Sequence, residues 1–374
     1  MSHRFIIAGG GTGGHIFPAV AIAESIRALA PDTQFLFVGA KGKMEMEKVP
    51  QAGFSIEGLD IAGLDRRKLW KNLLLPFKLL RSFIQVREIF HSFQPTAVIG
   101  VGGYSSYPVL RFAQSKQIPT FLHEANSFAG KSNQWLGKRA TAVFTGMPSM
   151  ETFFPANKIL FTGNPIRKMI GRTNIDPAAA RRHFGLNPAK PTLLVIGGSL
   201  GARSINLALQ AGYQELIHTG MQLIWQTGAS GASLPALDNE MNGVVCKTPF
   251  IKEMDLAYAA ADVVVARAGA MSIAELQVVG KPAILVPYPL AAEDHQTVNA
   301  MRLVNEQAAR LVRDADVQKE LIRTVIELMS DPSACAQMSA HMAGMGVPDA
   351  DRRIATAILE TLNQTPFNQP IQSH

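Results

Sequence analysis

Cysteine is scarce in this sequence, and its scarcity excludes one class of protein. The 374 residues include only Cys246 and Cys335, which cannot form the disulfide framework that stabilises many small secreted domains. The sequence also has no apolar run of the ~20 residues that a membrane-spanning helix needs. We expect no signal peptide before the strand-like residues 5–8. These absences predict a protein that works in a reducing cytosol and does not span a membrane.

Charged residues are also few, at 17%, whereas hydrophobic residues make up 47%. This balance excludes a disordered chain, and the length suggests two domains that are each large enough to bury a core. The formal net charge is nevertheless +7, which favours anionic partners such as nucleic acids, phosphate-bearing substrates or anionic lipids. The sequence has no zinc-finger cysteine pattern and no RNP-like aromatic motif, so we expect no nucleic-acid partner.

Short apolar runs alternate with longer helical patterns along the whole chain. Several of these runs are apolar throughout, which is typical of parallel strands covered on both faces, and the alternation predicts two doubly wound α/β sheets. A polar stretch after Gly163-Asn164-Pro165 favours a domain boundary there. The predicted strands lie at residues 4–8, 34–38, 97–100, 120–123, 142–145 and 159–162, and then at 192–196, 223–227, 263–266, 283–287 and 309–312.

Two glycine-rich turns stand between strands and helices in the first half. Residues 9–15 read Gly-Gly-Gly-Thr-Gly-Gly-His before a predicted helix at 17–30, and residues 100–106 read Gly-Val-Gly-Gly-Tyr-Ser-Ser. Such turns let backbone N–H groups approach phosphate, so two of them suggest a diphosphate or a long anionic acceptor. The alternative is a pair of tight turns without a ligand. A nicotinamide cofactor is disfavoured because Val38-Gly39-Ala40-Lys41 lacks the acidic residue that would bind ribose.

His15 ends the first of these turns and is a candidate general base. The helix N-terminus disfavours the imidazolium, which helps to keep the ring able to accept a proton. The alternative is a capping or packing histidine. The polar run His123-Glu124-Ala125-Asn126 follows another strand and is either a polar site or a hydrogen-bonded strand end.

The second half carries comparable turns. Ser199, in a glycine-rich turn, could bind phosphate or cap a helix. The N–H groups of Ala270–Ser272 could meet phosphate, and Glu275 could accept hydrogen bonds from a ribose diol or complete a capping box with Ser272. Asp314-Ala315-Asp316 matches a metal-binding D-x-D pattern, but we interpret Asp316 as a helix cap and expect no metal.

Residues 69–83 mix large apolar side chains with Lys71, Lys78 and Arg81. This mixture is typical of a segment that lies in a membrane interface with its cations on lipid headgroups. The alternative is a core helix with solvated lysines.

Taken in order along nearly the whole chain, these motifs resemble those of the MurG family of bacterial peptidoglycan glycosyltransferases. The resemblance implies a GT-B fold, in which two Rossmann-like doubly wound parallel-sheet domains face each other across a cleft. It also implies transfer of N-acetylglucosamine, without cofactor or metal and with inversion, from UDP-N-acetylglucosamine to the C4 hydroxyl of lipid I, undecaprenyl-diphosphate-MurNAc-pentapeptide. The product would be lipid II. The implied domains are 1–164 for the acceptor and membrane, 165–346 for the donor, and 347–374, a helix returning to the first domain followed by a polar tail.

The resemblance also assigns roles to individual residues. His15 matches the family's candidate base, Ile251 would hold the uracil through its backbone and Glu275 the ribose. The acceptor diphosphate would be bound by Gly13, Gly14, Gly102, Gly103, Tyr104 and Ser105. The donor would be bound by Thr12, Gly13, Gly14, Asn126, Arg167, Ser199, Ile251, Ala270, Met271, Ser272, Ile273, Ala274, Glu275 and Gln296.

The sequence departs from the family at Ala125, at Lys252-Glu253 and in the loop 290–295, which bears on single sugar contacts. The alternatives left open are a diacylglycerol glycosyltransferase or a UDP-N-acetylglucosamine 2-epimerase of the same fold, a nucleotide-binding subunit without chemistry of its own, and a nicotinamide oxidoreductase. The resemblance further implies a peripheral protein on the cytoplasmic face of the inner membrane. Its partners would include anionic phospholipid and cell-wall or division proteins.

Overall fold

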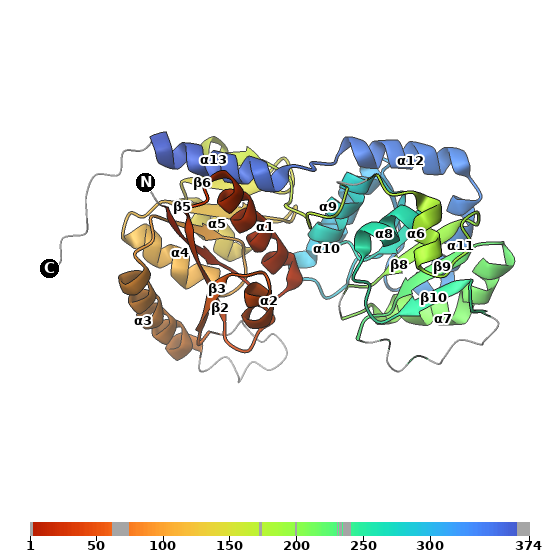
Figure 1. Cartoon of the computed structure of the whole chain (residues 1–374), viewed down its shortest axis with the longest axis horizontal. Helices are drawn as coiled ribbons and strands as arrows, with labels where there is room; N and C mark the ends of the chain where they lie inside the picture. Colours follow the sequence, from red (N-terminus) through yellow and green to blue (C-terminus); the bar gives the residue numbers. More distant parts are fainter. Residues whose placement is uncertain are drawn as a thin grey trace. The chain divides into compact units, whose positions relative to one another are not determined.

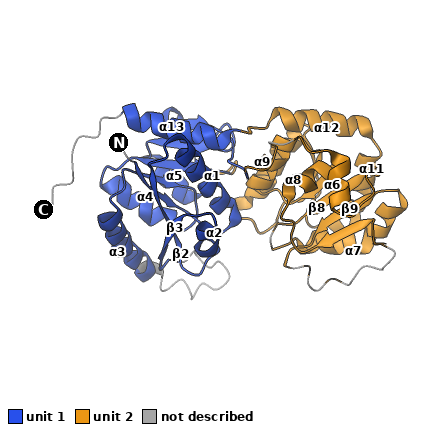
Figure 2. Ribbon diagram, in the orientation of Figure 1, with its two compact units in different colours: residues 1–125, 129–167, 349–374 blue, residues 126–128, 168–348 orange. Residues whose placement is uncertain are grey.

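The computed structural model describes residues 3–61, 75–171, 174–198, 200–229, 231, 234 and 241–364. These residues form two compact units (Figure 2). Unit 1 contains residues 1–125, 129–167 and 349–374, and unit 2 contains residues 126–128 and 168–348. In the described part of the chain, no helix combines the length and the apolar character needed to cross a membrane.

Unit 1 is built on a parallel sheet of seven strands in the order β3-β2-β1-β4-β5-β6-β7. The strands are apolar because helices cover both faces of the sheet. Phe5 and Ile7 of β1 pack on the side of α1 (Gly13–Leu29) and the C-terminal helix α13 (Ala350–Gln364). Ile6 and Ala8 pack on the other side, with α3 (Leu75–Phe93), α4 (Ser106–Ser115) and α5 (Lys131–Gly137). The strands are β1 (Arg4–Ala8), β2 (Gln34–Ala40), β3 (Ser55–Leu59), β4 (Ala97–Gly100), β5 (Thr120–Glu124), β6 (Ala142–Thr145) and β7 (Ile159–Phe161).

The helices of unit 1 include one from the end of the chain. Helix α13 packs along α1 (Figure 1), and its Asp351 accepts a hydrogen bond of 3.0 Å from the Ser25 hydroxyl. The helices are α1 (Gly13–Leu29), α2 (Glu45–Gln51), α3 (Leu75–Phe93), α4 (Ser106–Ser115), α5 (Lys131–Gly137), a 3₁₀ turn (Ala156–Lys158) and α13 (Ala350–Gln364).

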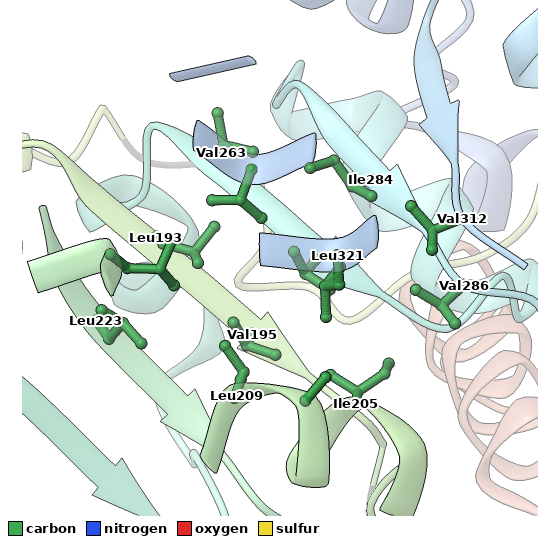
Figure 3. Close-up of a cluster of buried hydrophobic side chains, with 14 of the residues drawn as sticks. Leu193, Val195, Ile205, Leu209, Leu223, Val263, Ile284, Val286, Val312 and Leu321 are labelled. Atoms are coloured by element: carbon green, nitrogen blue, oxygen red, sulfur yellow. The ribbon is translucent and has the colours of Figure 1, made fainter. Parts of the chain in front are cut away.

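Unit 2 repeats the design with a parallel sheet of six strands in the order β10-β9-β8-β11-β12-β13. Figure 3 shows one face of its core, where Val195 and Ile284 of the sheet meet Leu209 of α7 and Leu321 of α11. The strands are β8 (Thr192–Ile196), β9 (Gln222–Gln226), β10 (Val245–Thr248), β11 (Val263–Ala266), β12 (Ala283–Leu285) and β13 (Ala309–Leu311). The helices are α6 (Pro177–His183), α7 (Arg203–His218), α8 (Met254–Ala260), α9 (Ala270–Val279), a 3₁₀ turn (Ala292–Asp294), α10 (His295–Asn305), α11 (Val317–Met329) and α12 (Pro332–Gly344).

In each sheet the strand order reverses once, and ligands of such sheets bind beyond the carboxyl ends of the strands at that point. In unit 1 the reversal lies between β1 and β4, which lead into the two glycine-rich turns of the first half. In unit 2 it lies between β8 and β11, which lead into residues 197–198 and 267–269. The topology therefore brings the predicted motifs together in pairs.

Candidate active site

The two glycine-rich turns of unit 1 are in direct contact. The Gly10 N–H donates to the Gly102 carbonyl at 3.3 Å. Gly102 and Gly103 adopt φ values of 91° and 89°, in the left-handed region that favours glycine. A Cβ added to Gly103 would lie only 2.4 Å from the Gly10 oxygen. Any side chain at position 103 would thus force the turns apart.

Some backbone amides of the first turn have hydrogen-bond partners within the protein, and others are left for a ligand. Helix α1 begins at Gly13, so the N–H groups of Gly13 and Gly14 have no acceptor within the helix, whereas the His15 amide donates to Thr12 at 3.1 Å. The Gly11 amide donates to the Glu45 carboxylate at 2.8 Å. The turn therefore offers an anion the amides of Gly13 and Gly14.

His15 is held in one tautomer by the first turn. Its Nδ1 lies 3.0 Å from the Gly10 carbonyl oxygen and 3.4 Å from the Thr12 hydroxyl. Because a carbonyl can only accept a hydrogen bond, Nδ1 carries the proton in the neutral ring and the lone pair is on Nε2. Nε2 faces the second turn, where a Cβ added to Gly102 would come within 2.9 Å of it. This is the arrangement that a general base at Nε2 requires.

The second turn presents one side chain outward and buries the next. Tyr104 is exposed, whereas the Ser105 hydroxyl is buried and has no hydrogen-bond partner among the described residues. The Ser106 hydroxyl donates to the Gly103 carbonyl at 2.8 Å and so closes the start of α4. Of the predicted acceptor residues, Tyr104 can thus contact a ligand through its side chain.

His123 and Glu124 are buried at the end of β5. The Glu124 carboxylate accepts hydrogen bonds from the Asn133 amide at 2.8 Å and the Gly130 N–H at 3.3 Å, which fixes the start of α5. Burial, and then the nearby charge of His15, lower the pKa of His123 to about 4. Polar groups of Gly163 and Asn164 oppose this shift in part, but neither ring nitrogen makes a hydrogen bond of normal geometry among the described residues.

The buried neutral ring of His123 makes the stability of the fold depend on pH. The folded pKa is about 4 and the ordinary value is 6.5, so the unfolded chain binds the proton first as the pH falls. The contribution of His123 to the free energy of unfolding should be constant above pH 6.5, fall between pH 6.5 and 4, and total about 3 kcal/mol. Between pH 7.5 and 5, His123→Gln should lose about 2 kcal/mol less than the wild type in chemical denaturation. Equal losses would contradict this assignment.

Helix α9 follows β11 at the point where the strand order of the second sheet reverses. It begins at Ala270, so the N–H groups of Ala270, Met271 and Ser272 have no acceptor within the helix, whereas the next amide donates to Gly269 at 3.0 Å. A capping box that starts at Ser272 is therefore absent. Three amides at a helix N-terminus suit a diphosphate.

Glu275 lies one turn further along α9 and is only 6% exposed. Its Oε2 accepts a hydrogen bond of 3.0 Å from the Tyr258 hydroxyl of α8. This contact orients the carboxylate, and a carboxylate can accept from further hydroxyl groups. Tyr258 was not among the predicted site residues, because its place in the helical stretch before β11 gave no sign of this role.

In unit 2, Ile251 lies in the loop after β10, and Gln296 is the second residue of α10. Ile251 is buried after β10, and neither its amide nor its carbonyl makes a backbone hydrogen bond among the described residues. The Gln296 side-chain oxygen accepts from the Tyr288 N–H at 2.9 Å, and its amide NH₂ group can act as a donor. Both features suit a ligand that offers hydrogen-bonding edges.

The D-x-D pattern has a different explanation from the predicted cap. Asp314 pairs with Arg267 at 2.6 Å and accepts from the Ser204 hydroxyl. Asp316 occupies the predicted position before the first residue of α11. Its side chain makes no capping hydrogen bond, so the predicted side-chain cap was wrong. The described residues contain no group of three His, Cys, Asp or Glu side chains that could hold a metal ion.

The remaining predicted donor residues are distributed over the chain. Asn126 belongs to unit 2, where the Asn299 amide donates to its side-chain oxygen at 3.4 Å. Arg167 is the last residue of unit 1 before the chain enters unit 2. Ser199 lies outside the described residues. Thr12 immediately precedes α1, and the whole run from Ala270 to Glu275, including Ile273 and Ala274, lies on α9.

Comparison with known proteins places both units in one family. Residues 5–145 match the glycosyltransferase family 28 N-terminal domain, and residues 192–354 match its C-terminal domain. A protein of Cytophaga hutchinsonii is 46% identical over 96% of this chain and 97% of its own, and one of Bacteroides fragilis is 47% identical over 97% and 96%. Both are named UDP-N-acetylglucosamine–N-acetylmuramyl-(pentapeptide) pyrophosphoryl-undecaprenol N-acetylglucosamine transferase.

Solved structures share the fold. The crystal structure of Acinetobacter baumannii MurG matches with a TM-score of 0.75 and 26% identity, over 96% of this chain and all of that one. A UDP-N-acetylglucosamine 2-epimerase matches with a TM-score of 0.66 and 15% identity, over 99% of each chain, which shows the fold alone. The prediction of two parallel-sheet domains of the GT-B type is thus confirmed. On these matches, the chain belongs to glycosyltransferase family 28 and, within it, to the MurG family.

Proposed function

We propose that this protein transfers N-acetylglucosamine from UDP-N-acetylglucosamine to the C4 hydroxyl of lipid I and so forms lipid II. The observation that carries the proposal is the full-length match to named transferases of this reaction. The chemistry of the two switch points supports it. Unit 1 offers a base at His15 beside the amides of Gly13 and Gly14, and unit 2 offers helix α9 with Glu275.

The proposed mechanism is a single displacement at the anomeric carbon. The Nε2 of His15 takes the proton of the acceptor C4 hydroxyl while its oxygen bonds to C1 of the sugar. The bond between C1 and the β-phosphate oxygen breaks, and UDP leaves with that electron pair. The amides at the start of α9 would stabilise the charge that develops on the leaving diphosphate. Attack opposite the α-linked leaving group gives a β-1,4 glycoside.

A transfer assay with competing acceptors tests the function. Purified protein would be incubated with labelled UDP-N-acetylglucosamine and a lipid I analogue, diacylglycerol, or no acceptor. We expect label to move only to the lipid I analogue. Labelled diacylglycerol would instead identify a glycolipid synthase, and an epimerised nucleotide sugar without acceptor would identify an epimerase.

Peripheral association with the cytoplasmic face of the inner membrane, through anionic phospholipid, is part of the proposal; contacts with cell-wall and division proteins are a further part. The described part of the segment 69–83 begins at Leu75, while Trp70 and Lys71 lie outside the described residues. Phe77, Leu80 and Ile84 share one face of α3 and are exposed, Phe77 by 71%. This exposure favours the membrane interpretation over a core helix.

Cationic side chains accompany the exposed face of α3 and continue over the neighbouring helix α4. Lys78 and Arg81 are exposed on α3. Beyond it, Trp135 is 71% exposed beside a cavity of about 300 Å³. Three cations, Arg111, Lys138 and Arg139, line this cavity, and between residues 89 and 150 the only acidic residue is the buried Glu124. Exposed aromatic and cationic groups together suit an anionic lipid surface.

Charge reversal on α3 tests this contact. Lys78→Glu combined with Arg81→Glu should weaken binding to anionic vesicles by at least about 30-fold, because each cation near such a surface contributes about 1 kcal/mol. Vesicle sedimentation measures the change. Lys190→Glu with Lys319→Glu, which alters the net charge equally at exposed positions of unit 2, is the control. Equal binding by both folded double variants would contradict the contact.

A further inference from the structure

Glu45 is a buried carboxylate that has no role in the single displacement described above. It is the first residue of α2 and is 1% exposed. Among the described residues it forms no ion pair, and its two oxygens accept hydrogen bonds from backbone amides instead. A buried charge without a cation is costly, so these hydrogen bonds are what offsets its burial.

The two hydrogen bonds attach Glu45 to the end of β2 and to the glycine-rich turn that follows β1. Oε1 accepts from the Ala40 N–H at 3.0 Å, and Oε2 accepts from the Gly11 N–H at 2.8 Å. The carboxyl group lies directly against Gly10, where an added Cβ would come within 2.3 Å of it. The first glycine-rich turn thus packs against this carboxylate and is hydrogen-bonded to it.

The Gly11 N–H and the Gly10 C=O belong to the same peptide group. On one side this group donates to Glu45, and on the other it accepts from Nδ1–H of His15 at 3.0 Å. In a trans peptide the N–H and C=O point in opposite directions, so one planar unit can connect the two side chains. Hydrogen bonds in such a chain polarise one another, which makes the carbonyl a stronger acceptor.

We propose that Glu45, the Gly10–Gly11 peptide and His15 form a relay that fixes the tautomer of His15 and strengthens Nε2 as a base. A carboxylate does this by direct contact with the histidine in Ser-His-Asp triads; here a peptide group intervenes. Glu45 is a positioning residue because it acts through the turn. The inference rests on the proposed function, in which His15 is the base.

The wild-type protein allows a first test that needs no activity. Nitrogen-15 NMR of the imidazole groups reports the tautomer, and the His15 signal is assigned as the one that disappears in His15→Ala. The relay predicts a protonated Nδ1 and an unprotonated Nε2 in the neutral ring. A neutral ring protonated on Nε2 would overturn the relay, whether or not the protein transfers sugar.

Glu45→Gln then tests the role of the charge. The amide keeps an acceptor for one backbone N–H and removes the negative charge. We expect kcat to fall at least about 10-fold and the acidic limb of the kcat–pH profile to move down by about 0.5 unit, because the imidazolium loses a stabilising carboxylate. Glu45→Asp, which keeps the charge, should retain more activity than Glu45→Gln.

Glu47→Gln is the matched control, because Glu47 lies exposed on the same helix. It should leave both kcat and the pH profile unchanged. If Glu45→Gln matched the wild type, or lost activity without moving the acidic limb, the carboxylate would have no more than a structural role and the relay would be refuted. If the wild type itself showed no transfer, the proposed function would fail, while the NMR result would still decide the relay.

Discussion

His15→Ala should lower kcat by about 10²–10⁴-fold, the range expected when a positioned base is removed. The geometry supports this role, since Gly10 holds Nδ1 as the donor and leaves the lone pair on Nε2. UDP affinity should change little, because the proposed UDP contacts at Ile251, α9 and Glu275 belong to unit 2. Steady-state kinetics with both substrates varied, together with calorimetric titration of UDP, separate the two effects.

His91→Ala provides the control, because His91 is an exposed histidine of unit 1 on α3. It should behave as the wild type in both measurements. A near-normal kcat in His15→Ala would make His15 a structural residue of the turn. Glu124 would then be the next candidate for the base, although its carboxylate already binds Asn133 and Gly130.

Glu275→Ala should show the opposite pattern and raise the dissociation constant of UDP by about 10–100-fold, with little change in kcat at saturating donor. A hydrogen bond to a charged group contributes about 1.5–3 kcal/mol, and the proposed ribose contact is remote from the reacting carbon. Calorimetry with UDP measures the change, and TDP, which lacks the ribose 2′-hydroxyl, should bind the wild type more weakly than UDP.

Tyr258→Phe separates the ribose contact from packing. It removes the hydroxyl that donates to Glu275 at 3.0 Å but keeps the carboxylate, so it should weaken UDP binding less than Glu275→Ala does. Glu275→Ala also removes the acceptor of the Tyr258 hydroxyl, which could lower the stability of the fold. The thermal unfolding temperatures of both variants control for this loss of stability. An unchanged UDP affinity in a folded Glu275→Ala protein would remove Glu275 from the donor site.

Hydrophobic pattern predicted the central strands well. The strands at 4–8, 97–100, 142–145, 192–196 and 263–266 were predicted with the boundaries that the structure has. These segments are buried on both faces of the sheet, so each is a continuous apolar run that can be recognised from its own residues. The pairing of glycine-rich turns at each switch point follows from this strand order.

The edge strands β3 and β10 and the start of α1 were not predicted, whereas the edge strands β7 and β13 were. β3 and β10 are edge strands with partly exposed residues, and so they lack the continuous apolar run. Helix α1 was predicted from residue 17 but begins at Gly13. The first residues of the helix were missed because glycine has a low intrinsic preference for helix, and Gly13 and Gly14 serve the neighbouring turn.

Glu45 shows why site residues that act through the backbone escape sequence reasoning. Locally it is an acidic residue at the start of a short helix, a place where acidic residues are common for their interaction with the helix dipole. Its contact with Gly11 joins residues 34 positions apart and depends on how β2 leads into α2. Only the three-dimensional structure brings that carboxylate under the turn that carries His15.

The stereochemistry of the product tests whether the sugar is transferred by a single displacement. The transferred sugar would be examined by NMR after reaction of UDP-N-acetylglucosamine with a lipid I analogue. A single displacement assisted by His15 predicts one product, with N-acetylglucosamine β-linked to the C4 oxygen of the muramyl residue. An α linkage, or a β linkage to another hydroxyl, would contradict the account.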